Sequence, residues 1–286
     1  MKKGCLIFAH NNRDIDYAKL ALLSGSLAKK NLNVPVSLVT DQSTVDWMTE
    51  SKIIDRANNT FEHIIVIDRP KTDNQRILHD GFEKKVIPFV NSSRSNAYDL
   101  SPYDKTLLID SDFLIFSNRL NQYWDTAESV KLAPAANDIN STDRLGYHDK
   151  FISDTGIHLY WATTVMFNKD LYSKLFFDLV ETIKSNYKYF ADLYMFNPKQ
   201  YRNDIAFSIA KHILSGFQTD TLNSLPSLLT VIDKDILYSV DGKKLTFLIS
   251  AMKAELQIAT AIQDTDVHIM NKQSIIRNFD NLMELV

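Results

Sequence analysis

Short apolar runs alternate with a segment of helical periodicity in the first half of the chain, and this alternation restricts the possible folds. Each run is continuously apolar, as expected of a strand buried on both faces of a sheet. The expected strands are Gly4–Ala9, Val34–Thr40, Ile64–Ile67 and Thr106–Ile109. A helix is expected from Asp14 to Lys30, because leucines recur on one face and two lysines favour its C-terminal end. Strand–helix–strand units pair in parallel with right-handed crossovers, so the pattern predicts an open α/β sheet.

The second half of the chain is less regular. Strands are expected at Val130–Ala133, Trp161–Phe167 and Val267–Met270, and helices at Lys169–Lys184, Arg202–Leu214 and Ser274–Leu285. The first of these helices carries an apolar stripe that is expected to face the core, formed by Leu171, Leu175, Leu179 and Ile183. A polar loop is expected from Asn137 to Asp154, and no element is predicted from Ser224 to Gln263, where helix and strand patterns compete. No repeat or linker interrupts the 286 residues, so a single domain is expected.

Composition excludes several classes of protein. The 32 basic and 35 acidic side chains give a net charge of −3, which argues against a protein that coats nucleic acid. The one cysteine, Cys5, lies in an apolar run and is expected to be a small buried hydrophobic residue, so a disulfide within the chain and a thiolate zinc site are excluded. No window approaches the roughly 20 apolar residues that span a bilayer, and the apolar start is too short for a signal peptide. A soluble, cytoplasmic protein is therefore expected.

The sequence Asp110-Ser111-Asp112 directly follows an apolar strand. Residues two apart in extended backbone point to the same side, so both carboxylates are expected to converge. Two carboxylates this close repel each other unless a positive group lies between them, and a divalent cation meets that need. The carboxyl end of a strand in an open α/β sheet is also where ligands bind. The pair is therefore predicted to bind a metal ion.

A second polar group of residues lies near the C-terminus, where His268 occupies a short expected strand and Lys272 follows four residues later. Two carboxylates, an imidazole and phosphate oxygens would suit Mn²⁺ better than Mg²⁺, which accepts imidazole less readily. Lys272 would then stabilise a departing diphosphate as a point charge. Considered by itself, His268 is more often a structural histidine than a ligand, and it is the upstream acidic pair that favours the metal site.

The order of these motifs resembles the GT-A glycosyltransferases, in particular the glycogenin-like and lipopolysaccharide-type sugar transferases. In that family a strand ending in Asp-x-Asp holds the metal and a late histidine followed by lysine completes the site. The usual His-x-x-Gly-x-x-Lys is shortened here to His268-Ile-Met-Asn-Lys272, which puts the role of Lys272 in doubt more than that of His268. The run Pro102-Tyr103-Asp104-Lys105 also resembles uncharacterised glycosyltransferases of tailed bacteriophages.

The resemblance implies a GT-A (Rossmann-like) α/β fold: an open mixed sheet flanked by helices, with a helical part at the C-terminus. Residues 1–118 would form the nucleotide- and metal-binding half, and residues 119–286 the sugar- and acceptor-binding half. Mn²⁺ (or Mg²⁺) and a nucleoside-diphosphate sugar would be the cofactor and the donor.

The resemblance also assigns roles to single residues. Metal ligands would be Asp110, Asp112 and His268. The nucleotide-sugar would be bound by Ala9, His10, Asn11, Tyr17, Asp41, Arg94, Ser111, Thr163 and Lys272. Direct roles in catalysis would fall to Asp204, Lys272 and Arg94. Structural alternatives stay open for three of them: Asp41 as a turn residue, Arg94 as a surface arginine and Asp204 as a helix cap. In the polar loop, Asp138 and Asp154 would contact sugar hydroxyls or simply be solvated.

The reaction implied is transfer of a hexosyl or pentosyl group to a hydroxyl, through an oxocarbenium-like transition state. The likeness to glycogenin-type enzymes favours retention of configuration. The acceptor is either a glycan or a hydroxymethylated pyrimidine in phage DNA. DNA would need a basic, aromatic rim, which the segment from Lys184 to Arg202 could supply, although core aromatic residues are the simpler explanation.

Three other functions fit parts of the sequence. A haloacid-dehalogenase-type phosphohydrolase also carries Asp-x-Asp after an apolar strand, but normally on the first strand. A sugar nucleotidyltransferase should open with a glycine-rich phosphate loop, and the opening loop from Ala9 to Arg13 has no glycine. A non-catalytic sugar-nucleotide binder would not need the acidic pair and His268 intact.

Overall fold

The computed structural model describes residues 1–286 except 72–73, 91, 141–143, 155, 221–223 and 251–256. Its main sheet has six strands in the order β3-β2-β1-β6-β10-β8. The strands are β1 Lys3–Phe8, β2 Val36–Thr40, β3 His63–Val66, β6 Lys105–Ile109, β8 Val130–Ala133 and β10 Trp161–Asn168. β1, β2, β3 and β6 are mutually parallel, whereas β10 is antiparallel to both β6 and β8. The expected open mixed α/β sheet flanked by helices is confirmed.

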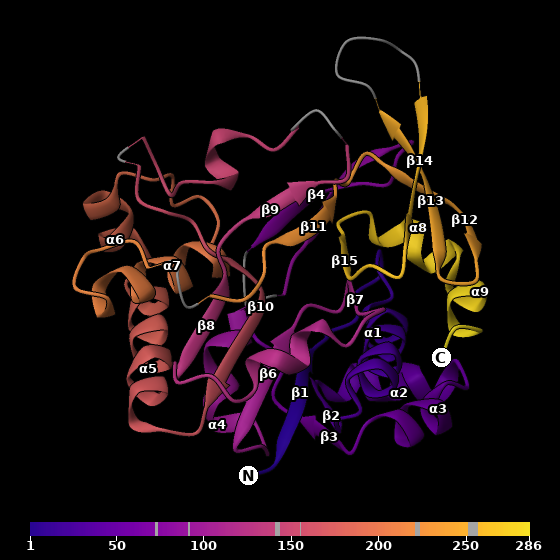
Figure 1. Ribbon diagram of the computed structural model, residues 1–286, viewed down its shortest axis with the longest axis horizontal. Coiled ribbons are helices and arrows are strands. Elements are labelled where there is room, and N and C mark those ends of the chain that lie inside the picture. The colour runs from indigo at the N-terminus through magenta and orange to yellow at the C-terminus, as the bar shows by residue number, and fades with distance from the viewer. Residues whose placement is uncertain (72–73, 91, 141–143, 155, 221–223, 251–256) are drawn as a thin grey trace.

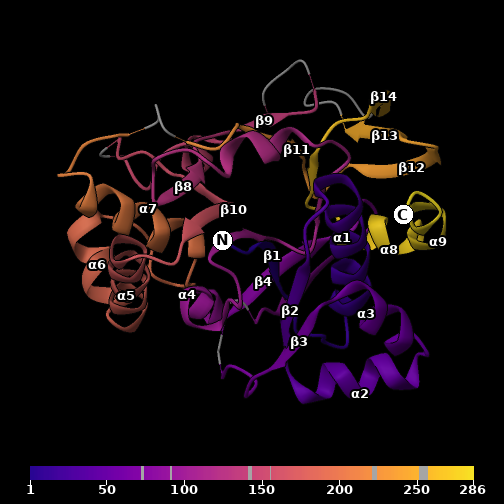
Figure 2. The same ribbon diagram turned by 60° about the horizontal axis from the view of Figure 1, so that its bottom comes forward.

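Both faces of this sheet are buried because helices cover them (Figures 1 and 2). Cys5 and Ile7 of β1 belong to one core and Leu6 to the other, as expected for side chains that alternate across a strand. The first core lies beneath α1 Tyr17–Leu32, with α2 Gln42–Glu50 and α3 Ile54–Thr60 nearby. The second lies beneath α5 Leu171–Ser185, α6 Tyr187–Tyr194 and α7 Asn203–Leu214. Cys5 is fully buried, as predicted.

The apolar stripe predicted on α5 is only partly correct, because Ile183 is buried and Leu179 packs against the core but the other two leucines do not. Leu171 is 84% exposed and Leu175 is 52% exposed. The buried face is formed instead by Ser173, Phe176, Phe177, Val180 and Ile183. Val180 and Ile183 follow Phe176 at helical spacing, and Phe176 and Phe177 are the largest side chains of this face. Their larger rings fill the space against β10 and α7, so they and not the leucines determine which face is buried.

A second sheet brings the middle and the end of the chain together. Its strand order is β7-β15-β11-β9, with β7 Phe113–Leu114, β9 Ala136–Asp138, β11 Leu228–Val231 and β15 Val267–Ile269. β15 pairs with β7 in antiparallel register, which places His268 opposite Phe113. Because β7 begins one residue after Asp112, this pairing places the C-terminal histidine beside the acidic pair.

The segment without a predicted element contains strands. β12 Ile236–Asp241, β13 Lys244–Ser250 and β14 Gln257–Gln263 form an antiparallel sheet, and β4 Gln75–His79 pairs with β5 Lys84–Pro88 in a hairpin that the sequence reasoning did not predict. The closing helix is interrupted at Asn278, giving α8 Lys272–Arg277 and α9 Phe279–Met283. The remaining short helix is α4 Ala97–Leu100, which follows a 3₁₀ turn at Ser92–Asn96. Within the described ranges, none of the helices is both long and apolar enough to cross a membrane.

Candidate active site

A tight turn between β6 and β7 positions the acidic pair. The amide of Asp110 donates a hydrogen bond to the carbonyl of Thr163 in β10 (2.9 Å), and the amide of Phe113 donates to the carbonyl of Asp110 (3.1 Å). The carbonyl of Asp112 accepts from the amide of Ile269 in β15 (3.0 Å). The two carboxylates therefore converge because a turn is fixed between two sheets, and not because the backbone is extended as the sequence reasoning assumed.

His268 reaches the same point from β15. Its Nε2 lies 3.5 Å from an oxygen of Asp112, and the indole of Trp161 meets its ring edge-on with centroids 5.9 Å apart. One ligand atom from each of Asp110, Asp112 and His268 lies within 4.8 Å of the others. The three predicted metal ligands are thus brought together.

Two cations face these carboxylates. Lys272, the first residue of α8, contacts Asp112, and Arg94 from the 3₁₀ turn contacts Asp110. Lys272 and Asp112 have side chains that are 7% and 4% exposed, whereas the carboxylate of Asp110 is 32% exposed. Arg94 is therefore a buried residue of the site and not a surface arginine.

The two carboxylates differ in their electrostatics. Burial by itself would raise the pKa of Asp112, but the nearby charges of Lys272 and His268 hold it well below its usual range. Burial raises the pKa of Asp110, and the charge of Asp112 adds to this effect while Arg94 opposes it. Asp112 is thus the more strongly anionic member of the pair.

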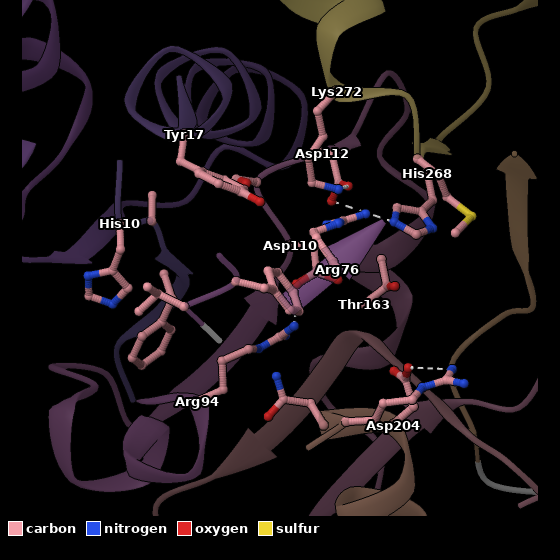
Figure 3. A pocket seen from close by; sticks show the side chains of 18 of the residues that line it. His10, Tyr17, Arg76, Arg94, Asp110, Asp112, Thr163, Asp204, His268 and Lys272 are labelled. Carbon is pink, nitrogen blue, oxygen red and sulfur yellow. Dashed lines mark hydrogen bonds and ion pairs between the residues drawn. The ribbon is translucent and has the colours of Figure 1, made fainter. Parts of the chain in front are cut away.

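These residues line one cavity of about 500 Å³, which Figure 3 shows from close by. From the predicted nucleotide-sugar and catalytic residues, the cavity is lined by Ala9, His10, Tyr17, Arg94, Ser111, Thr163, Asp204 and Lys272. Arg94 and Asp204 lie on the side of the cavity opposite Lys272 (Figure 3). The cavity thus gathers side chains from both halves of the chain around the acidic pair.

Several buried polar atoms on the cavity wall have no hydrogen-bond partner within the described residues. They are the hydroxyl of Tyr17, Nε and Nη2 of Arg94 and Nδ1 of His268. Burial raises the pKa of Tyr17 to about 12, so this group remains a neutral hydroxyl that can donate a hydrogen bond. Buried polar atoms are nearly always paired in native proteins, so an unpaired group of them around one cavity indicates a polar ligand.

Arg76 is a cavity residue that the sequence reasoning missed. It comes from β4, and its guanidinium lies over the ring of Phe89 at 4.9 Å. Its charge lowers the pKa of Lys272, an effect second only to the burial of that lysine. The sequence Gln75-Arg-Ile-Leu-His79 has no alternation of polar and apolar residues that would predict a strand, and only the folded hairpin places this arginine in the cavity with the acidic pair.

Two predicted nucleotide-binding residues, Asn11 and Asp41, do not line the cavity. Asp41 is 2% exposed and begins α2 as its N-cap, accepting a hydrogen bond from the amide of Thr44. Its other oxygen lies 2.8 Å from Nδ1 of His10 and 3.0 Å from Arg69. Asp41 therefore orients His10, which itself reaches the cavity.

Asn11 has a similar supporting position. Its side-chain oxygen accepts a hydrogen bond from the backbone amide of Ala18 (2.7 Å), and its backbone amide donates one to Thr44 Oγ1 (2.9 Å). The loop after β1 is thereby fixed to the first turns of α1 and α2. Asn11 holds the shape of the loop that carries Ala9 and His10.

At the far end of the cavity, Asp204 lies in the first turn of α7. It accepts a hydrogen bond from the amide of Ala162 (3.0 Å) and pairs with Arg202 (3.1 Å). The residue at the N-cap is Arg202, without a side-chain cap, so the capping interpretation of Asp204 is wrong. Its carboxylate instead joins α7 to β10 at the cavity edge.

The two aspartates of the polar loop behave differently. Asp154 is exposed, consistent with a solvated residue. Asp138 is neither solvated nor part of the cavity, because its oxygens accept hydrogen bonds from Arg144 (2.6 and 2.8 Å). Arg144 also pairs with Asp235 (2.7 Å), and all three side chains are at most 3% exposed. Asp138 therefore belongs to a buried ion triad.

The basic and aromatic segment around α6 is largely structural. Phe190, Tyr194 and Tyr201 are buried, and Tyr187 packs edge-on against Tyr201 with ring centroids 5.1 Å apart. Lys184 pairs with Glu181 (2.6 Å). The core explanation for these aromatic residues is the one that fits.

Comparison with known proteins gives structural neighbours alone. No family model and no curated protein matches the chain. Similar solved structures include the glycosyltransferase GlyE of Streptococcus pneumoniae TIGR4, with 14% identity over 75% of this chain and a TM-score of 0.41. The galactosyltransferase LgtC, with donor and acceptor sugar analogues, shows 15% identity over 77% of this chain and 81% of its own, at a TM-score of 0.44. TarS of S. aureus shows 16% identity over 73% of this chain and 55% of its own, at a TM-score of 0.37.

The chain spans 43% of the length of GlyE. The likeness to these structures concerns the fold. The three similar structures include proteins described as a glycosyltransferase and a galactosyltransferase.

Proposed function

We propose that this chain transfers a sugar from a nucleoside-diphosphate donor to a hydroxyl group, with the help of a divalent metal ion. The observation that carries the proposal is a single cavity in which two carboxylates and an imidazole face two cations, surrounded by buried donors without partners. A diphosphate chelated to a cation would satisfy all of these groups together.

Asp110, Asp112 and His268 would hold the ion. Carboxylate oxygens with one imidazole suit Mn²⁺, and Mg²⁺ is the alternative. A ligating histidine uses one ring nitrogen for the metal and offers the other to a neighbouring group. Nδ1 of His268 has no hydrogen-bond partner among the described residues, so it is free for one of these two roles. When bound, the ion supplies positive charge to the diphosphate oxygens as the donor bond breaks.

The diphosphate would also be met by Arg94, Arg76 and Lys272. As the bond from the sugar to the diphosphate breaks, negative charge grows on the leaving oxygen, and cations fixed in a buried cavity stabilise it strongly. The Tyr17 hydroxyl would donate to the same group of oxygens. Lys272 has this role although its motif is shortened, because α8 begins directly at the cavity.

The nucleoside would lie along the loop after β1, against Ala9 and His10, with Asn11 and Asp41 as supports. The sugar would lie towards Thr163 and Asp204, which form the opposite wall (Figure 3). We favour retention of configuration, in which the acceptor hydroxyl attacks from the face of the departing diphosphate and its proton passes to that group. The transferred group would be a hexose or a pentose.

We propose a glycan hydroxyl as the acceptor in preference to hydroxymethylated DNA. A DNA acceptor would need free cations and exposed rings for phosphates and bases. Lys184 and Arg202 are instead paired with acidic residues, and Phe190, Tyr194 and Tyr201 are buried in the core. Of the residues expected to form this rim, Lys188, Lys199 and Tyr189 are the exposed ones, and one exposed ring is little for stacking bases.

Thermal unfolding with a panel of nucleoside diphosphates, each with and without Mn²⁺, tests the donor and metal parts of the proposal. One nucleotide should raise Tm strongly and only with the metal, because ligands that bind the folded state stabilise it. Asp110→Asn should abolish the metal-dependent part, whereas Asp154→Asn, which changes an exposed aspartate, should not.

Product analysis separates the alternatives. Sugar transfer predicts release of nucleoside diphosphate from a nucleotide-sugar, and a phosphohydrolase predicts release of inorganic phosphate. Nucleotide binding without turnover in any donor and acceptor mixture would favour a non-catalytic binder.

A further inference from the structure

The strand β14 Gln257–Gln263 forms an open edge of the small antiparallel sheet. It pairs with β13 over all seven of its residues without a bulge, and with no other strand in the described part of the chain. Five of the seven residues are exposed, and none carries a charge or is a proline. Natural proteins usually protect an exposed edge with charges, proline or a bulge, because its free backbone groups can pair with another chain. β14 has none of these protections.

The opposite edge of the same sheet is covered. In β12 the amide of Leu237 donates to the hydroxyl of Ser274, and its carbonyl accepts from the side chain of Asn278 (2.9 Å). Figure 2 shows β12 beside α8 and α9, with β14 farther from these helices. The start of β12 is thus covered by the protein itself, whereas β14 pairs only with β13 among the described strands.

The sequence of β14 reads the same in both directions. Gln257-Ile-Ala-Thr-Ala-Ile-Gln263 is symmetric about Thr260. If two copies of this strand pair in antiparallel fashion about a two-fold axis at Thr260, every residue faces one of its own kind. An isologous interface needs a patch that fits itself after a rotation of 180°, and a palindromic strand meets this need in a simple way, because like side chains pack together on each face.

We propose that β14 binds β14 of a second copy of this chain, which joins the two three-stranded sheets into one continuous six-stranded sheet. This inference concerns assembly and does not rest on the proposed function. Pairing of exposed strand edges is a known recognition mode in which backbone hydrogen bonds supply affinity. Cross-strand neighbours on each face then determine the register.

Side-chain burial supports this register. Ile258 and Ile262 pair with Ile249 and Leu245 of β13, so they lie on the face of the sheet that points to the core. Ile258 is nevertheless 52% exposed, because no strand lies beyond it. In the proposed pair, Ile258 of each copy lies opposite Ile262 of the other, and the apolar face continues across the interface.

On the other face, Ala259 would lie opposite Ala261 of the second copy. This pair permits a charge-reversal test, because both alanines are exposed and their replacement should leave the fold intact. The wild type should sediment as a dimer over a range of concentrations. Ala259→Lys/Ala261→Lys should sediment as a monomer, since two pairs of lysines would face each other. Ala259→Glu/Ala261→Glu should also be a monomer.

Mixing the lysine and glutamate variants should restore a dimer that contains one chain of each kind. A general loss of folding could not produce this rescue. Tyr238→Lys, which changes an exposed residue of β12 in the same sheet, should remain a dimer as the matched control. A monomeric wild type at the highest attainable concentration, or a lysine double variant that is still dimeric, would overturn the proposal.

A disulfide test fixes the register. Thr260→Cys would place two cysteines directly opposite each other, with Cα atoms about 4.5 or 5.5 Å apart, within the range of a disulfide. Air oxidation should therefore link most of this variant into covalent dimers. The native Cys5 is fully buried and should not compete. Ala259→Cys should link far less, because it faces residue 261 of the second copy; equal linking of both variants would refute the register about Thr260.

Discussion

Lys272 and Asp112, 160 residues apart in the chain, form a buried ion pair at the centre of the cavity. Asp112 follows the sixth strand, whereas Lys272 opens the penultimate helix. The pairing of β15 with β7 brings them together, and His268 accompanies Lys272 on the same segment. One strand pairing therefore positions both a buried cation and a candidate metal ligand beside the acidic pair.

Asp112→Asn should destabilise the protein strongly, because it leaves Lys272 buried without its charge partner. Breaking a buried pair from one side typically costs about 3–5 kcal/mol. The double variant Asp112→Asn/Lys272→Met should recover much of that loss, since neither buried charge remains. Urea unfolding of the wild type, both single variants and the double variant gives the coupling energy. Additive effects of the two substitutions would show that the pair does not interact.

Tyr17→Phe should have opposite effects on stability and on donor binding. The hydroxyl is buried without a partner, so its removal should stabilise the ligand-free protein by about 1 kcal/mol. The same change should weaken the binding of a nucleoside diphosphate with Mn²⁺, because a donor to the ligand is lost. Calorimetric titration and thermal unfolding measure the two effects.

Tyr103→Phe is the control for this prediction. The Tyr103 hydroxyl lies 2.6 Å from that of Ser37, so its removal should destabilise the protein and leave nucleotide binding unchanged. A Tyr17→Phe variant that binds nucleotide as tightly as the wild type would place the hydroxyl outside the ligand site.

Arg76→Met should weaken nucleoside-diphosphate binding by about 10- to 100-fold, because a charge-assisted hydrogen bond contributes about 1.5–3 kcal/mol. The fold should be preserved, since Arg76 belongs to a surface hairpin. The dissociation constant can be measured with Mn²⁺ present, using Arg56→Met in the exposed face of α3 for comparison. Equal affinities of these two variants would exclude Arg76 from the diphosphate site.

Arg144→Met should unfold the protein or destabilise it by about 3–5 kcal/mol, because Asp138 and Asp235 would be left as neighbouring buried carboxylates. Arg277→Met removes an exposed pair with Asp80 at 3.5 Å and should cost about 1 kcal/mol or less. The difference in urea midpoint between the two variants measures the contribution of the triad. Similar midpoints would mean that the triad adds little to stability.

Much of the fold was predictable from local patterns. The parallel strands β1, β2 and β6 were visible as continuous apolar runs, because strands covered on both faces carry no polar alternation. The small sheet of β12, β13 and β14 was not visible in the same way. Its strands are only partly buried, so their residues mix helix- and strand-like periods.

The candidate site could likewise be predicted only in part from the sequence. Asp110, Asp112 and His268 were predicted from residue type and position, and their side chains do converge. Arg76 was missed because an arginine in a hairpin has no local signal that relates it to a distant aspartate. Asp41 was expected to bind the nucleotide-sugar, but its carboxylate oxygens accept hydrogen bonds from His10, Thr44 and Arg69.

The sequence by itself determined the strands of the main sheet, the acidic pair after β6 and the chemical types of the proposed ligands, because periodicity and residue type are local properties. Tertiary structure alone decided which face of α5 is buried, that Asp138 joins Arg144 in the core, and that β14 pairs on one side only within the described residues. These outcomes depend on competition among side chains for the same interior space and the same hydrogen-bond partners. That competition involves residues far apart in the chain, so it is resolved only when the chain is folded.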